Sequence, residues 1–126
     1  MPDPDDPFAA ASRATDFMMV YIEEAHAEDE WPISSGRYPK APVRIMQPRT
    51  ASERVGVARE FLHEYTVGQD TRMDCVVDDP EQANPFEKAF APWPLRLFVV
   101  EDGRLTWIAQ PKNCEYDVAL LREFLL

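Results

Sequence analysis

The stretch that decides the fold is residues 17–31, "FMMVYIEEAHAEDEW". Its first six residues, 17–22, are all apolar and rich in β-branched and aromatic types. A short apolar run of this kind predicts a strand that is covered on both faces. The chain then turns abruptly polar, beginning at Glu23. Because open α/β sheets bind their ligands where the carboxyl ends of the strands meet solvent, we expect a site at the end of this strand.

Glu24 and His26 are the acid–base pair of that strand end. Residues two apart on an extended chain point to the same side. An imidazole beside a carboxylate can accept, hold and return a proton near neutral pH. The alternative is that both side chains are simply solvated. On residue types alone this alternative is the more common case, because titratable pairs greatly outnumber functional sites.

Length and charge limit the class of protein. The chain has 126 residues, enough for one domain with one modest core. Its net charge of −10 argues against nucleic acid or an anionic membrane as the main partner, since both would repel it. The sequence shows neither an apolar run of transmembrane length nor the layout of a signal peptide, so we expect a cytoplasmic protein.

The two cysteines, Cys75 and Cys114, do not form a Cys-x-x-Cys pair. We expect no structural disulfide in a reducing compartment, and each thiol is predicted to be a small buried hydrophobe. Their spacing does not suggest a metal site, and we expect neither a metal nor a bound cofactor.

The rest of the chain divides into a short tail and one domain. Residues 1–7 are acidic and proline-rich and predict a disordered tail, followed by a domain over 8–126. After the first strand the sequence predicts a helix from Thr50 to Gly68, with Glu53 completing a capping box. A strand at 73–77 and a short helix or turn at 85–90 follow. The chain then forms a hairpin of strands 95–100 and 104–109 around Asp102–Gly103, and it ends in a helix capped by Asp117.

The segment between Trp31 and Thr50 is predicted to be a long loop, because four prolines prevent a continuous helix. Loops of this length in a compact domain are often functional. The segment is also basic, through Arg37, Lys40, Arg44 and Arg49. These charges mark either an anion-contacting surface or, as is more common, partners of nearby carboxylates.

The run "VYIEEAH", residues 20–26, together with Asp29 and Trp31, resembles the iodothyronine deiodinases, which are thioredoxin-fold selenoenzymes. Their hallmark strand ends in Tyr-Ile-x-Glu-Ala-His, followed by Asp-Gly-Trp; here Glu30 replaces the glycine. The resemblance continues in order over residues 8–126, through "CVVDD" and "WPLRLFVVEDGR". It implies an α/β, thioredoxin-like fold with a mixed, mostly parallel sheet flanked by helices.

The resemblance also implies roles for individual residues. His26 and Glu24 would be catalytic and move protons around a selenol. Trp31, Pro94 and Arg96 would contact the substrate, with Pro94 in the position where thioredoxin folds place a cis-proline. The ordinary alternatives are a packed tryptophan and an arginine paired with acids. One departure is that residues 32–50 contain no histidine, whereas the family has one shortly before the pair that matches Glu53–Arg54.

The family's nucleophile is what the sequence lacks. The selenocysteine lies in a Ser-Cys-Thr-Sec run at the tip of the first core strand, and we expect that strand to be missing here. No cysteine precedes Cys75, so no thiol or selenol nucleophile is assigned. A gene start placed too late, a true pseudoenzyme and removal of an N-terminal piece are all open explanations.

Without the central strand, the neighbouring strands would leave backbone N–H and C=O groups unpaired. Each buried unpaired group would destabilise the fold by about 1–3 kcal/mol. We therefore predict direct closure, giving one four-stranded sheet in the order 73–77, 17–22, 95–100, 104–109, with only the last strand antiparallel.

Two functions follow from the sequence. The first is a deiodinase-like oxidoreductase domain, catalytically incomplete as written, which would use a thiol reductant as co-substrate if active. The alternative is a non-catalytic binding module that uses the old substrate cleft for a small aromatic or halogenated phenolic ligand or for a protein partner. A homodimer is left open.

Overall fold

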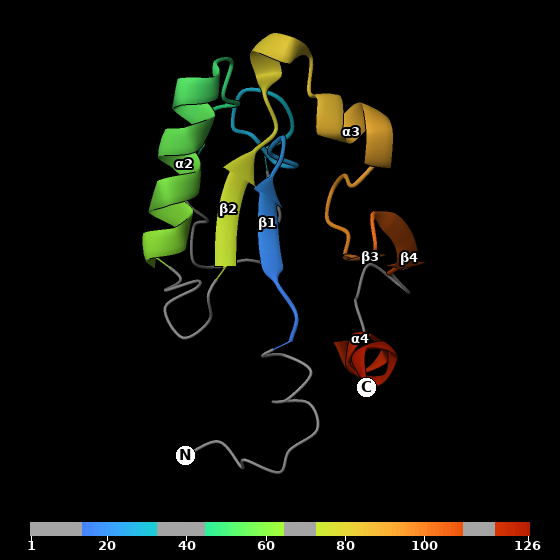
Figure 1. Cartoon of the computed structure of the whole chain (residues 1–126). Coiled ribbons are helices and arrows are strands. Elements are labelled where there is room, and N and C mark those ends of the chain that lie inside the picture. Colours follow the sequence, from blue (N-terminus) through green and yellow to red (C-terminus); the bar gives the residue numbers. More distant parts are fainter. Residues whose placement is uncertain (1–13, 33–44, 65–72, 110–117) are drawn as a thin grey trace. The chain divides into compact units, whose positions relative to one another are not determined.

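The computed structural model describes residues 14–32, 45–64, 73–109 and 118–126. The described chain is a mixed α/β protein with short sheets and helices, as predicted at that level (Figure 1). It falls into two compact units, 18–94 and 95–126 with 1–17, which are described separately. The predictions for the tail, Gly68, Cys114, Asp117, Arg37, Lys40 and Arg44 lie outside the described residues.

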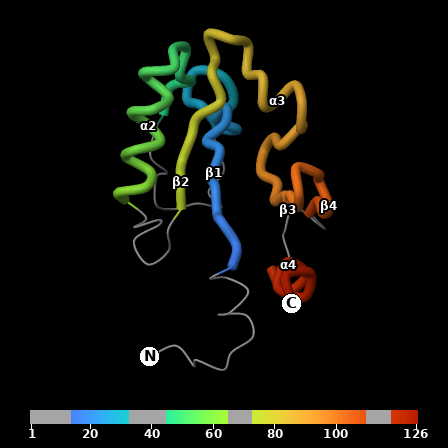
Figure 2. The backbone as a smooth tube through the Cα atoms, viewed as in Figure 1, coloured from blue at the N-terminus to red at the C-terminus, as the bar shows by residue number. Residues whose placement is uncertain are grey.

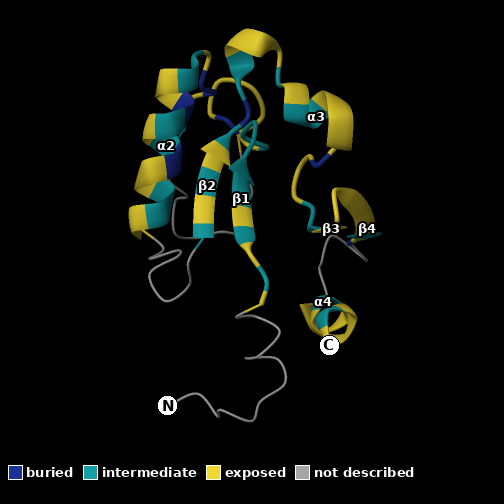
Figure 3. Cartoon of the chain, viewed as in Figure 1, coloured by how far each residue is buried: buried dark blue, intermediate teal, exposed yellow. Residues whose placement is uncertain are grey.

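In the 18–94 unit, strand β1 (Phe17–Tyr21) pairs with β2 (Met73–Val77), and the two lie side by side in Figure 1. Tyr21 contacts Phe61 of helix α2 with 5.8 Å between ring centroids. In β1 only Met18 is exposed, at 64%, whereas β2 alternates between half-buried and exposed residues, with Val76 45% exposed (Figure 3). Coverage of the first strand on both faces stays a prediction.

Helix α2 (Ala51–Glu64) begins where the capping box predicted. The Thr50 hydroxyl accepts the Glu53 N–H at 3.1 Å, and the Glu53 carboxylate accepts the Thr50 N–H at 3.2 Å. These bonds satisfy N–H groups that have no partner within a helix. Ala58, on the predicted apolar stripe, is buried.

The end of β2 is held by Asp78. Its N–H donates to the Tyr21 carbonyl at 2.9 Å, which continues the pairing with β1. Its carboxylate accepts the N–H groups of Phe86 and Glu87, both at 2.9 Å, and so caps helix α3 (Pro85–Phe90). A single 3₁₀ turn, η1 (Pro80–Gln82), lies between the strand and the helix. The short helix predicted at 85–90 is confirmed.

The second unit contains the predicted hairpin. Strands β3 (Phe98–Glu101) and β4 (Arg104–Ile108) pair antiparallel around Asp102 and Gly103, whose φ angles are 50° and 72°. Positive φ at both turn positions is what a tight two-residue hairpin requires. Helix α4 (Val118–Leu125) places Phe124 against Trp107, with 5.9 Å between the ring centroids.

The described strands pair within each unit, β1 with β2 in one and β3 with β4 in the other. The order of a single four-stranded sheet, which would join the two units, stays a prediction. A ladder requires the hydrogen-bonding groups of both strands to meet along several residues. The expected strand 95–100 is a strand only from Phe98, and it pairs with β4 inside its own unit.

Within the described ranges, each helix is too short or too polar to pass through a bilayer.

The glycines of the described residues give a paired stability test. A Cβ at Gly56, inside α2, or at Gly103, in the hairpin turn, would meet nothing within 4 Å. Gly56→Ala should raise the free energy of unfolding by about 0.5–1 kcal/mol, because glycine weakens a helix interior. Gly103→Ala should lower it by about 1 kcal/mol, because φ is +72°. Urea unfolding followed by circular dichroism measures both, and equal signs would contradict this account.

Candidate functional site

The polar residues after β1 fold back over the carboxyl end of that strand (Figure 2). β1 ends at Tyr21, so Glu24 and His26 lie beyond it. The Ala27 carbonyl accepts the N–H groups of Glu30 at 3.1 Å and Trp31 at 3.0 Å, which winds the loop into a turn. The alternation of a strand therefore does not extend to Glu24 and His26, and the same-side argument made from their spacing does not apply.

Glu24 is bound by the strand that precedes it. The Tyr21 hydroxyl donates a short hydrogen bond to Glu24 Oε1. Burial raises the pKa of Tyr21 well above its ordinary value, and the Glu24 carboxylate, as hydrogen-bond acceptor and as a negative charge, raises it further. The phenol therefore stays protonated and acts as a fixed donor that orients the carboxylate.

His26 has a different partner. Its Nδ1 lies 3.1 Å from the Trp31 carbonyl oxygen, which can only accept, so Nδ1–H donates to that oxygen. In the neutral ring Nε2 is then the acceptor. The two rings are 4.9 Å apart at a tilt of 50°. Trp31 is 61% exposed. The ordinary alternative, a packed tryptophan, does not fit this exposed ring, which contacts His26 on the surface of the loop. Contact of Trp31 with a substrate stays a prediction.

Glu24 and His26 are brought into the same loop but are not joined by a hydrogen bond within the described residues. Each side chain is instead fixed by its own neighbour, Tyr21 or Trp31. Their linkage through a water molecule stays a prediction.

The residue that organises this loop, Gln47, was not singled out by the sequence. It is 5% exposed. Its Oε1 accepts the Glu24 N–H at 3.0 Å, while its Nε2 donates to the Glu24 carbonyl at 3.0 Å and to Glu30 Oε2 at 3.1 Å. One carboxamide therefore pairs both backbone groups of Glu24, as a neighbouring strand would.

A charged cluster lies beside Gln47. The Gln47 N–H donates to Asp29 at 2.9 Å and lowers the pKa of that carboxyl group below its ordinary value, with Arg49 acting in the same direction. Arg49 lies 3.3 Å from Asp29 and 3.1 Å from Glu30. Its side chain is 65% exposed, so these ion pairs add little stability. For Arg49, the alternative of pairing with nearby carboxylates is confirmed.

Arg54 is the second residue whose structural importance the sequence did not indicate. It is 1% exposed. One guanidinium nitrogen donates to the Asp78 carbonyl at 2.7 Å and to Asn84 Oδ1 at 2.6 Å. Its Nε has no hydrogen-bond partner among the described residues. The sequence feature that could have indicated its burial is its position four residues before Ala58, on the buried side of α2.

The remaining predicted site residues, Pro94 and Arg96, belong to different units. The Trp93–Pro94 peptide bond is cis, as expected for Pro94. Arg96 belongs to the other unit, where it is half-buried and precedes β3.

Cys75 is a free, half-buried thiol on β2. Burial raises its pKa above the ordinary thiol value. A reactive cysteine needs the opposite shift, since the thiolate is the nucleophile. The geometry therefore gives no support to Cys75 as a replacement nucleophile.

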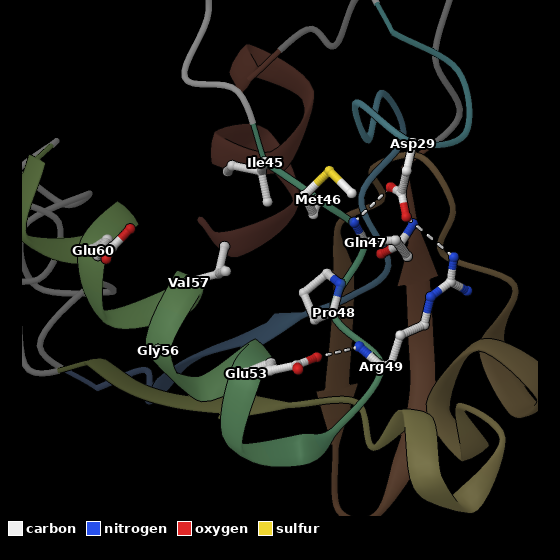
Figure 4. Close-up of a pocket in the computed structure, with 10 residues that line it drawn as sticks. All are labelled: Asp29, Ile45, Met46, Gln47, Pro48, Arg49, Glu53, Gly56, Val57 and Glu60. Atoms are coloured by element: carbon white, nitrogen blue, oxygen red, sulfur yellow. Dashed lines mark hydrogen bonds and ion pairs between the residues drawn. The ribbon is translucent and has the colours of Figure 1, made fainter.

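A surface groove of about 550 Å³ lies between α2 and the segment that precedes it (Figure 4). Asp29 and Gln47 line it, which places it next to the loop but on residues other than Glu24 and His26.

Comparison with known proteins gives the lineage. The family model for iodothyronine deiodinase matches residues 8–126. The chain belongs to the iodothyronine deiodinase family. It is 30% identical to thyroxine 5-deiodinase of Sus scrofa over 113 residues, 90% of this chain and 33% of that protein. It is 32% identical to thyroxine 5-deiodinase of Sparus aurata over 110 residues, 87% of this chain and 37% of that protein.

Type I iodothyronine deiodinase of Xenopus laevis is 26% identical over 92 residues, 73% of this chain and 31% of that protein. The chain thus spans about a third of the length of these curated relatives. The matched region of this deiodinase-family chain includes the Tyr21–Glu24 pair, His26 and the Gln47 contact described above.

The Gln47 contact can be tested with an isosteric change. Gln47→Glu keeps the acceptor for the Glu24 N–H but removes the donor to Glu24 and Glu30, and places a new carboxylate near Glu30. Stability at pH 7 should fall by about 1–3 kcal/mol. The new carboxyl group should have a raised folded-state pKa, so the deficit relative to wild type should shrink as the pH falls through that pKa.

Urea unfolding of both proteins at pH 7 and about pH 4.5 measures this effect. The matched control is Gln82→Glu, at an exposed position of the same unit, which should stay within about 0.5 kcal/mol of wild type. If the loss of stability in the Gln47→Glu variant does not change with pH, the raised pKa expected for the new carboxyl group is contradicted.

Cys75 reactivity is a second test of the site. In a Cys114→Ser background, alkylation of Cys75 by iodoacetamide at pH 7 should be about tenfold slower than that of free cysteine, because burial raises the thiol pKa. The rate should climb through alkaline pH and reach the free-cysteine rate in urea. A plateau reached near neutral pH would show an activated thiolate instead.

Proposed function

We propose that this chain is a deiodinase-type oxidoreductase domain with a thioredoxin-like fold, and that its 126 residues supply the proton-handling part of the site without the selenol or thiolate nucleophile. The observation that carries the proposal is the fixing of Glu24 inside the family's hallmark motif: its carboxylate accepts the Tyr21 hydroxyl, and its backbone pairs with the Gln47 carboxamide. The alternation of strands and helices from β1 to α4 supports the thioredoxin-like part of the proposal.

The chemistry of reductive dehalogenation explains why these residues would matter. Replacing a carbon–iodine bond by a carbon–hydrogen bond consumes two electrons and one proton and releases iodide. A selenol or thiol supplies the electrons and is returned to its reduced form by a thiol co-substrate. In this proposal His26 passes the proton through Nε2, and Glu24 supplies a fixed carboxylate in the same loop.

A fixed carboxylate suits this task. Because the Tyr21 phenol stays protonated, it holds Glu24 without competing as an acid near neutral pH. The buried Gln47 fixes the backbone at Glu24. Because the carboxylate is already ordered before the reaction, little further conformational entropy is lost when the transition state forms.

A second function is favoured by the exposed His26–Trp31 ring pair. Two aromatic rings 4.9 Å apart on the surface of a loop form a platform on which a planar ligand can stack. Cys75, with its raised pKa, does not supply a nucleophile. In this alternative the chain binds a small aromatic or halogenated phenolic ligand without chemical turnover.

The catalytic part of the proposal predicts that the 126-residue chain releases no iodide from an iodothyronine in the presence of dithiothreitol. The reason is the missing low-pKa thiol or selenol. Iodide release is measured with a radiolabelled substrate, using His26→Ala as the matched control. Turnover well above that control would show that Cys75 or Cys114 acts as the nucleophile.

The binding part predicts that 2,6-diiodophenol binds the same chain and that Trp31→Ala weakens binding by about fivefold or more, since one aromatic stacking contact is worth about 1 kcal/mol. Isothermal titration calorimetry measures the affinity, and Trp107→Phe in the other unit is the control. If the Trp31→Ala variant binds with the same affinity as wild type, the His26–Trp31 ring pair is not the binding site.

A further inference from the structure

The groove beside α2 is built from one face of the helix and one extended segment. Glu53, Gly56, Val57 and Glu60 follow the spacing that places residues on the same side of a helix. Residues 45–49 form the opposite wall, and Figure 4 shows the side chains of both walls around the same space. Its volume of about 550 Å³ is within the range of small-molecule sites.

The middle of the groove is apolar. Ile45, Met46, Pro48 and Val57 line it between the charged ends (Figure 4). Met46 is 59% exposed. Leaving a large apolar side chain in water forgoes about 25 cal/mol for every Å² that could be buried, so an apolar body in the groove would be stabilised there.

Gly56 opens the helical wall. A Cβ at this position would meet nothing within 4 Å, so the packing of the folded chain does not require a glycine. Glycine nevertheless weakens the middle of a helix. What the missing side chain provides is room for a ligand to approach the backbone of α2.

The charges of the groove favour a cation. Three carboxylates, Asp29, Glu53 and Glu60, line it against one guanidinium, Arg49. Arg49 is already paired with Asp29 and Glu30, and Glu53 accepts the N–H groups of residues 49 and 50. Glu60 makes no hydrogen bond or ion pair with the residues described here. It lies at the opposite end of the groove from Asp29 and Arg49 (Figure 4).

We propose that this groove binds a small organic cation, with an apolar body about the size of one aromatic ring over Met46, Val57 and Gly56 and an ammonium group against Glu60. The site is independent of the deiodinase chemistry proposed above, because it uses neither Glu24 nor His26.

The test is a titration of ¹⁵N-labelled protein followed by amide NMR shifts, with three probes of matched shape. 2-Phenylethylamine should shift the amides of 45–47 and 53–60. 2-Phenylethanol, which lacks the charge, should bind about two- to fivefold more weakly, the effect of one exposed ion pair. Phenylacetate should not shift these amides. Equal shifts from the amine and the anion would overturn the proposed charge selection.

Three variants locate the site. Glu60→Gln should weaken amine binding by about two- to fivefold and leave the alcohol unchanged. Asp74→Asn, which removes an exposed carboxylate from β2 outside the groove, should change neither. Gly56→Leu should abolish binding of both probes while circular dichroism shows a retained helix. A folded Gly56→Leu protein that binds like wild type would overturn the proposal.

Discussion

The structure of the site depends on one constraint, which is that every backbone group at the end of a strand needs a partner. β1 stops at Tyr21, and the chain beyond it leaves the β1–β2 ladder. The Gln47 side chain supplies the partners at Glu24 by presenting an acceptor and a donor on one carboxamide. The Asp78 N–H is the partner of the Tyr21 carbonyl. Together with the bond from the Gln47 N–H to Asp29, these contacts fix the path of the polar loop.

The features that sequence analysis predicted correctly depend on residues close together in the chain. The capping box at Thr50 and Glu53 and the tight turn at Asp102–Gly103 are local chemistry, and the structure contains both. The short helix at 85–90 follows a turn-forming Asp-Asp-Pro run and is also local. Pro94 is different, because its cis bond was expected from the family resemblance and not from its neighbours.

The features that sequence analysis missed depend on contacts between distant residues. Gln47 is 23 positions from Glu24, and Arg54 is 24 from Asp78. A glutamine in a proline-rich loop and an arginine in a helix carry no sign of burial. Strand partners are likewise chosen by long-range geometry, so the apolar pattern of each strand does not determine the order of strands in a sheet.

Arg54 gives the 18–94 unit a property that its short elements would not have separately. Arg54 belongs to α2, and its guanidinium donates hydrogen bonds to the carbonyl of Asp78, which follows β2, and to Asn84, the residue before α3. Opening any one of these elements would leave a desolvated charge without its acceptors, which is costlier than losing an ordinary contact. The three elements are therefore coupled into one cooperative unit of local unfolding. Their amide protons should show one shared free energy of opening in hydrogen exchange, although no single element is long enough to be stable alone.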